Sequence, residues 1–230
     1  MSADAVGPYG TDIYTEPDAD PDTLANLGPL RGLAGIWEST EGSDDHPVGP
    51  GSDIDGPVVD GGLHNVFVER YELQPIDPQT NGPQLFYGLR YHTHVVKPGE
   101  VETFHDQVGY WLWEPAANMV LHTLAIPRGQ VVLAAGATQP DATEFEVSAS
   151  SGAKSYGILT NPFLDTAFQT LSFRMRVAVH GDDTWSYEED TLMQLPDRAE
   201  PFHHIDRNTL TRVGAPTPNP LMQAGASETS

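Results

Sequence analysis

Two neighbouring histidines, His203 and His204, lie near the start of the last β-like segment of the chain, "FHHIDRNTLTRV" (202–213). Successive side chains of a β-strand point to opposite faces, so at most one of the two rings faces the interior. A neutral imidazole nitrogen that faces an interior pocket can bind a metal ion. His204 shares a strand face with Leu210 and Arg212, whereas a bulge between them would turn His203 inward instead. We therefore predict His204 as the metal ligand and keep His203 as the alternative.

A competing metal site lies in "YHTHV" (91–95), where His92 and His94 share one strand face. Two imidazoles at this spacing could chelate one first-row metal ion. Glu189, in "TWSYEED" (184–190), is the third candidate. If this strand turns its aromatic residues inward, burial would raise the pKa of the Glu189 carboxyl and suit it to proton transfer. A metal-dependent barrel enzyme using His92, His94 and Glu189 is therefore one of the hypotheses.

The composition excludes several classes of protein. Eleven Lys and Arg against 33 Asp and Glu give a net charge of −22, which disfavours binding to nucleic acid and to anionic membranes. The chain has no cysteine, so thiol catalysis and zinc–thiolate or iron–sulfur sites are excluded. The N-terminus lacks the features of a signal peptide, and no apolar stretch reaches the roughly 20 residues of a membrane span. We expect a cytoplasmic protein without membrane or nucleic-acid partners.

Composition also divides the chain into three parts. Residues 1–22 are rich in Asp, Pro and Gly and are expected to form a disordered or extended arm. Residues 23–213 are expected to form the ligand-binding domain, and residues 214–230 a disordered tail. Residues 21–35 suit a short helix that Asp22 caps. Residues 41–64 are predicted to be a long Gly/Pro/Asp loop.

The middle of the chain is a series of strand-like segments separated by turn residues. In residues 170–180 apolar residues alternate with polar ones, which indicates one dry and one wet face. Consecutive antiparallel strands of this kind must close into a barrel, or stack, to bury that face and their edges. We predict an all-β fold, an antiparallel up-and-down β-barrel with a short N-terminal helix. The predicted strands are 66–75, 84–96, 101–114, 119–126, 130–136, 143–150, 170–180, 184–195 and 206–213.

Four ordered motifs resemble a known family. "GLAGIWEST" (32–40) is similar to the Gly-x-Trp start of lipocalins, fatty-acid-binding proteins and nitrobindins. The segments "HDQVGYW" (105–111), "LAIPRGQVVLAAG" (124–136) and "HHIDRNTLTRV" (203–213) narrow the resemblance to the nitrobindins, a family of haem-binding β-barrels. Together the motifs cover roughly residues 27–213.

The resemblance implies a calycin-like barrel of about ten strands. Gly35 and Trp37 would close one barrel end, with Arg212 packed across the indole ring. It further implies ferric haem b bound through His204 or His203, nitric oxide binding, and isomerisation of peroxynitrite to nitrate. Asp206 could orient the His204 ring.

Tyr110 and Trp111 are neighbours, so one of them is expected to line the haem cavity. The main alternative is a haem-free carrier of a small planar or apolar ligand. The sequence identifies no catalytic residue, and a homodimer is left open.

Overall fold

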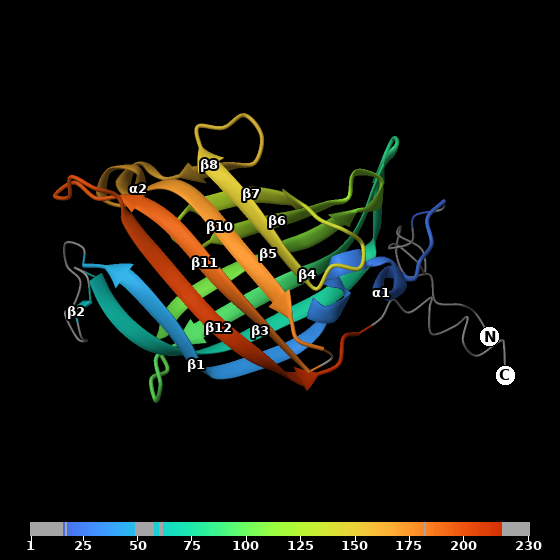
Figure 1. The fold of residues 1–230 in the computed structure, drawn as a ribbon, viewed down its shortest axis with the longest axis horizontal. Helices are drawn as coiled ribbons and strands as arrows, with labels where there is room; N and C mark the ends of the chain where they lie inside the picture. The colour runs from blue at the N-terminus through green and yellow to red at the C-terminus, as the bar shows by residue number, and fades with distance from the viewer. Residues whose placement is uncertain (1–15, 17, 49–57, 60–61, 182, 218–230) are drawn as a thin grey trace, which may run out of the picture.

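The computed structural model describes residues 16, 18–48, 58–59, 62–181 and 183–217. These residues fold into one curved sheet of twelve strands that closes on itself (Figure 1). The strands are β1 (Gly35–Pro47), β2 (Val58–Val59), β3 (Gly62–Asn81), β4 (Gln84–Val96), β5 (Thr103–Glu114), β6 (Met119–Ile126), β7 (Gln130–Ala137), β8 (Glu144–Ser151), β9 (Gly157–Thr160), β10 (Gln169–Val179), β11 (Thr184–Gln194) and β12 (Phe202–Gly214).

The barrel closes because β1 pairs with β12 on one side and with β3 on the other. Eleven strands form the ring, and the two-residue β2 only extends one end of β3. The predicted β-barrel is therefore confirmed, with eleven strands rather than about ten. One neighbouring pair, β8 and β9, is parallel because β9 turns back to lie between β8 and β7. The predicted purely antiparallel order is wrong at this one place.

Two short helices close one end of the barrel. These are α1 (Thr23–Asn26) and the 3-10 helix η2 (Gly28–Leu33). Asp22 caps α1 by accepting a hydrogen bond from the amide of Ala25 at 2.9 Å. We call these two helices the helical plug. Its inner face is apolar and is formed by the fully buried side chains of Leu27, Leu30 and Leu33.

Trp37 lies directly on this plug, fully buried. Its Nε1 atom donates to the carbonyl oxygen of Leu33 at 2.8 Å. The guanidinium of Arg212 lies 4.0 Å from the indole centroid, within cation–π distance. Gly35 makes this approach possible, since a Cβ atom there would lie 2.4 Å from Arg212 Nη1.

The predicted loop 41–64 is wrong at both ends. β1 continues to Pro47 and pairs with the first residues of β3, so Asp44 lies opposite Asn65 and His46 opposite Leu63. The side chains of Asp44 and His46 point into the barrel, where strand prediction expects apolar residues. The usual alternation is therefore missing from the sequence although the strand is present. Residues 49–57 and 60–61 lie outside the described residues.

The ends of the chain are only partly described. α1 begins at Thr23 and β12 ends at Gly214, while most of the predicted arm (1–22) and residues 218–230 of the predicted tail lie outside the described residues. Among the residues that the structure describes, no helix has the length and apolarity that a membrane crossing requires.

Candidate functional site

A cavity of about 340 Å³ opens at the barrel end opposite the helical plug. Its mouth lies near the end of β1 and near α2 (Pro162–Ala167) (Figure 1), whereas Trp37 is the third residue of β1. One part of the wall is apolar and aromatic. The apolar lining residues include Phe67, Phe104, Leu124, Ile126, Val132, Phe173 and Met175.

The polar part of the wall comes mainly from β1, β3, β11 and β12. In the strand order of the ring these strands lie across the barrel from β6 and β7, which carry Leu124 and Val132. The polar part is rich in carboxyl groups, and its acidic and histidine side chains are Asp44, His46, Glu69, Glu189, His204 and Asp206.

His204 faces this cavity from β12. Its Nε2 atom lies 2.8 Å from Asp44 Oδ1 and 3.4 Å from Asp206 Oδ2. Burial opposes protonation of the ring, but the neighbouring carboxyl groups of Asp206 and Asp44 outweigh it and raise the pKa of His204 to about 9. This shift favours the protonated form of the ring at neutral pH. Of the described residues, these three form a group whose potential metal-ligating atoms all lie within 4.8 Å of one another.

His203 points to solvent on the other side of the same strand. Its Nδ1 atom lies 2.9 Å from Asp190 Oδ1, and its side chain is 59% exposed. The pairing of β12 with β11 has no register shift from His203 to Leu210. No bulge in this pairing therefore turns His203 inward and His204 outward. Strand parity alone therefore decides which ring reaches the cavity.

Glu189 lies on the cavity wall, as its shared face with Trp185 suggested. Burial raises the pKa of Glu189 to about 7, although the nearby His204 opposes the shift. Burial also raises the pKa of Asp206 well above its usual range. Glu189 can therefore exchange a proton near neutral pH.

Glu69 forms the floor of the polar wall and is almost fully buried. Its carboxyl group accepts hydrogen bonds from Thr93 Oγ1 at 2.7 Å, Tyr187 OH at 2.9 Å and Asn208 Nδ2 at 2.6 Å. Burial nevertheless raises the pKa of Glu69, because desolvation exceeds the effect of these three donors.

Sequence reasoning missed Asp44, His46 and Glu69. The signal for Glu69 is present in "FVERY" (67–71), where a charged residue shares a strand face with Phe67 and Tyr71. A carboxylate on an apolar strand face indicates either a polar cavity or a buried network. The sequence gives no comparable indication for Asp44, because its segment (41–64) has the composition of a loop.

Tyr110 and Trp111 do not line the cavity with His204. Tyr110 lies on the outer surface of β5 and is 43% exposed. Trp111 is fully buried deeper in the barrel, where its ring stacks on His122 with centroids 3.8 Å apart.

His92 and His94 lie on the outer face of β4. His92 Nε2 lies 2.9 Å from Asp106 Oδ2, and His94 Nε2 lies 3.1 Å from Thr103 Oγ1. The strand turns Tyr91, Thr93 and Val95 inward instead, and all three are buried. The structure therefore does not bring the two histidines together with Glu189, which lines the inner cavity.

His122 is a fully buried imidazole beneath the cavity. Its Nε2 atom lies 2.9 Å from Tyr91 OH, and its Nδ1 atom has no hydrogen-bond partner. Burial lowers the pKa of His122 to about 3, so the folded protein keeps this ring neutral while the unfolded chain takes up a proton near pH 6.5.

We expect this histidine to make the fold acid-sensitive. As the pH falls from 6.5 toward 3, His122 should lower the free energy of unfolding by about 1.4 kcal/mol per pH unit. Urea denaturation of the wild type and of His122→Gln across this range measures the difference, since all other titrating groups are shared. Parallel pH profiles for the two proteins would contradict the expectation.

The fold and the cavity define the class of protein: a closed, calycin-like β-barrel with one end plugged and a ligand-sized cavity at the other. The chain belongs to the THAP4-like, heme-binding beta-barrel domain family, whose model matches residues 26–212. The resemblance to nitrobindins is thereby confirmed, and the chain is a haem-binding barrel domain of this type.

One solved structure extends the comparison of the fold. The crystal structure of Rv2717c from M. tuberculosis is 18% identical in sequence, with a TM-score of 0.53. The match covers 86% of this chain and 98% of that chain. At this identity the likeness is one of fold. A search of curated proteins found no match to the sequence.

Proposed function

We propose that the cavity binds ferric haem b with His204 as the iron ligand. The observation that carries the proposal is the position of the His204 ring, which faces the cavity from β12 while the apolar residues of β6 and β7 lie across the barrel. An axial imidazole together with an apolar wall is what a protein needs to hold a porphyrin.

The lining residues fit such a group, on two observations. Thr170 Oγ1 is a buried hydroxyl on the cavity wall without a hydrogen-bond partner among the described residues, so it can serve a ligand. Arg128 is the one Lys or Arg among the described lining residues. It is the natural partner for a ligand carboxylate in a cavity that otherwise carries acidic groups.

Asp44 and Asp206 hold His204 from one side of its ring. Both contact the Nε2 atom, so Nδ1 is not used in these contacts. The two carboxyl groups fix the orientation of the ring, as carboxylates do beside many metal-bound imidazoles. They also raise the pKa of the ring, so a metal would compete with a proton for the ring nitrogen. Glu189 is a carboxyl group in the same cavity that can exchange a proton at neutral pH.

The proposed reactivity follows the family resemblance. When bound, ferric haem would supply a binding site for nitric oxide and a Lewis acid for the isomerisation of peroxynitrite to nitrate. The apolar wall around Phe173 and Met175 would limit the access of bulk water to this site.

A hemin titration of the purified protein tests the proposal. We expect a Soret band with micromolar hemin in the wild type, and loss of at least about tenfold in affinity (about 1.4 kcal/mol) in His204→Ala. His203→Ala is the matched control, because this neighbouring ring points to solvent, and it should behave as the wild type.

Two outcomes would contradict the proposal. An unchanged hemin spectrum with the wild type would favour the haem-free carrier instead. Equal hemin affinities of His204→Ala and the wild type, with both folded by circular dichroism, would exclude His204 as the ligand.

A further inference from the structure

The outer wall of the barrel has an unusual apolar area across β4 to β7 and β9. On β10, by contrast, the outward side chains of Arg174 and Arg176 are charged and form ion pairs. On β7 the outward residues are instead Val131 and Leu133, so this strand is apolar on both faces. Of the eleven large hydrophobic side chains that are exposed among the described residues, six line this one area. They are Val108, Tyr110, Val131, Leu133, Tyr156 and Leu159.

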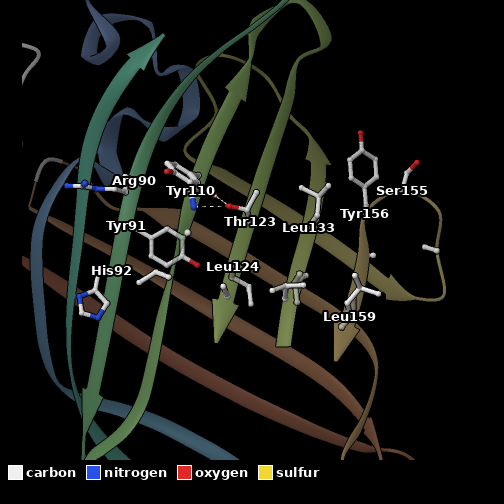
Figure 2. Close-up of a pocket in the computed structure, with 18 of the residues that line it drawn as sticks. Arg90, Tyr91, His92, Tyr110, Thr123, Leu124, Leu133, Ser155, Tyr156 and Leu159 are labelled. Atoms are coloured by element: carbon white, nitrogen blue, oxygen red, sulfur yellow. Dashed lines mark hydrogen bonds between the residues drawn. The ribbon is translucent and has the colours of Figure 1, made fainter. Parts of the chain in front are cut away.

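This area is a groove of about 1060 Å³, because residues 152–156, which join β8 to β9, form its outer wall. Figure 2 shows Arg90 and Tyr110 on the side of β4 and β5, and Tyr156 and Leu159 on the opposite side. Tyr156 has a φ of 55°, a left-handed conformation that is unfavourable for a bulky residue. Backbone strain of this kind is concentrated at ligand sites.

The charges of the groove differ from those of the whole chain. The chain carries a net charge of −22, yet the groove is lined by two cations, Arg90 and Lys154, and one carboxylate, Glu72. Glu72 is already bonded to Arg70, with 2.9 Å between Arg70 Nε and Glu72 Oε1. Arg90 and Lys154 make no hydrogen bond or ion pair with any residue that the structure describes. The groove therefore offers free positive charge beside apolar surface.

We propose that this outer groove is a second ligand site, separate from the cavity, for an amphipathic organic anion such as a medium- or long-chain carboxylate. The apolar part of the ligand would lie on Val131, Leu133 and Leu159, and its acid group would meet Arg90 or Lys154. The volume is close to the range of about 300–1,000 Å³ that is typical of small-molecule clefts. Two free cations in an acidic protein select an anion over a neutral or cationic amphiphile.

Isothermal titration calorimetry with dodecanoate, and with dodecyltrimethylammonium as the cationic counterpart, tests the ligand class. Dodecanoate should bind and the ammonium compound should not. The double variant Arg90→Gln/Lys154→Gln should weaken dodecanoate binding about tenfold or more, as loss of a charged hydrogen bond implies. Arg31→Gln/Arg176→Gln is the matched control, because it removes the same charge away from the groove and should leave binding unchanged.

Amide chemical-shift changes identify which site dodecanoate occupies. We expect them at residues 108–110, 131–133 and 154–159, and we expect Leu133→Asp to abolish them while leaving the hemin titration intact. Changes confined to the cavity residues, or binding that the groove variants do not alter, would overturn the proposal. So would a wild-type dimer in sedimentation that Leu133→Asp dissociates, since the groove would then be an interface between two copies of the chain.

Discussion

Glu69→Ala is expected to lower the free energy of unfolding by about 3 kcal/mol or more, because it leaves buried donors without an acceptor. The carboxyl group of Glu69 is the shared acceptor for Thr93, Tyr187 and Asn208, which belong to three different strands. An alanine cannot accept these hydrogen bonds, and Glu69 is only 2% exposed. Urea denaturation monitored by tryptophan fluorescence measures the loss.

Glu146→Ala is the matched control for Glu69→Ala. Glu146 lies on the outer face of β8 and is half exposed, 3.8 Å from Arg174, so its removal should change stability by less than about 0.5 kcal/mol. A Glu69→Ala protein as stable as the wild type would show that relief from carboxyl desolvation balances the lost hydrogen bonds. In that case Glu69 would contribute to the polarity of the cavity and not to the stability of the fold.

The second large effect is expected at the plugged end. Trp37→Ala should cost about 4 kcal/mol, the usual range for a large aromatic residue removed from a core. The indole is fully buried, packs against Trp185 at 6.3 Å between ring centroids, and carries the Arg212 guanidinium on its face. Guanidinium chloride denaturation measures the change.

Phe163→Ala provides the comparison for Trp37→Ala, since this aromatic side chain is 67% exposed on α2 and should be nearly neutral. Trp37→Phe should lie between the wild type and Trp37→Ala, because the smaller ring retains part of the buried surface. A Trp37→Ala protein that unfolds at the wild-type denaturant concentration would mean that the helices alone close the barrel.

Two properties of the cavity oppose each other: metal binding needs a neutral His204 ring, whereas the neighbouring carboxyl groups favour its protonation. The proposed axial role of His204 requires a neutral imidazole, but Asp206 and Asp44 raise the pKa of this ring to about 9. The acidic wall also repels ligand carboxylates except near Arg128. Under the proposed ligation by His204, haem binding should therefore also depend on the carboxyl groups around the ring.

The sequence alone determined the barrel and most of its strands. Alternation of apolar and polar residues fixed β4 and β6 at both ends, because a strand with one buried face must show this period. The family resemblance of the Gly-x-Trp segment implied the plugged end. Strand parity placed His204 and not His203 on the face of Leu210. These are local properties, which a single segment of chain carries by itself.

Only the tertiary structure decided what surrounds His204. Asp44 comes from a segment that reads as a loop, 160 residues away in the chain, and reaches the ring only when β1 closes the barrel against β12. The outer groove has the same origin, because β9 and the preceding residues 152–156 fold over strands that are distant in sequence. These contacts form only when the barrel closes. The residue pattern within one strand does not indicate which other strands will be its neighbours.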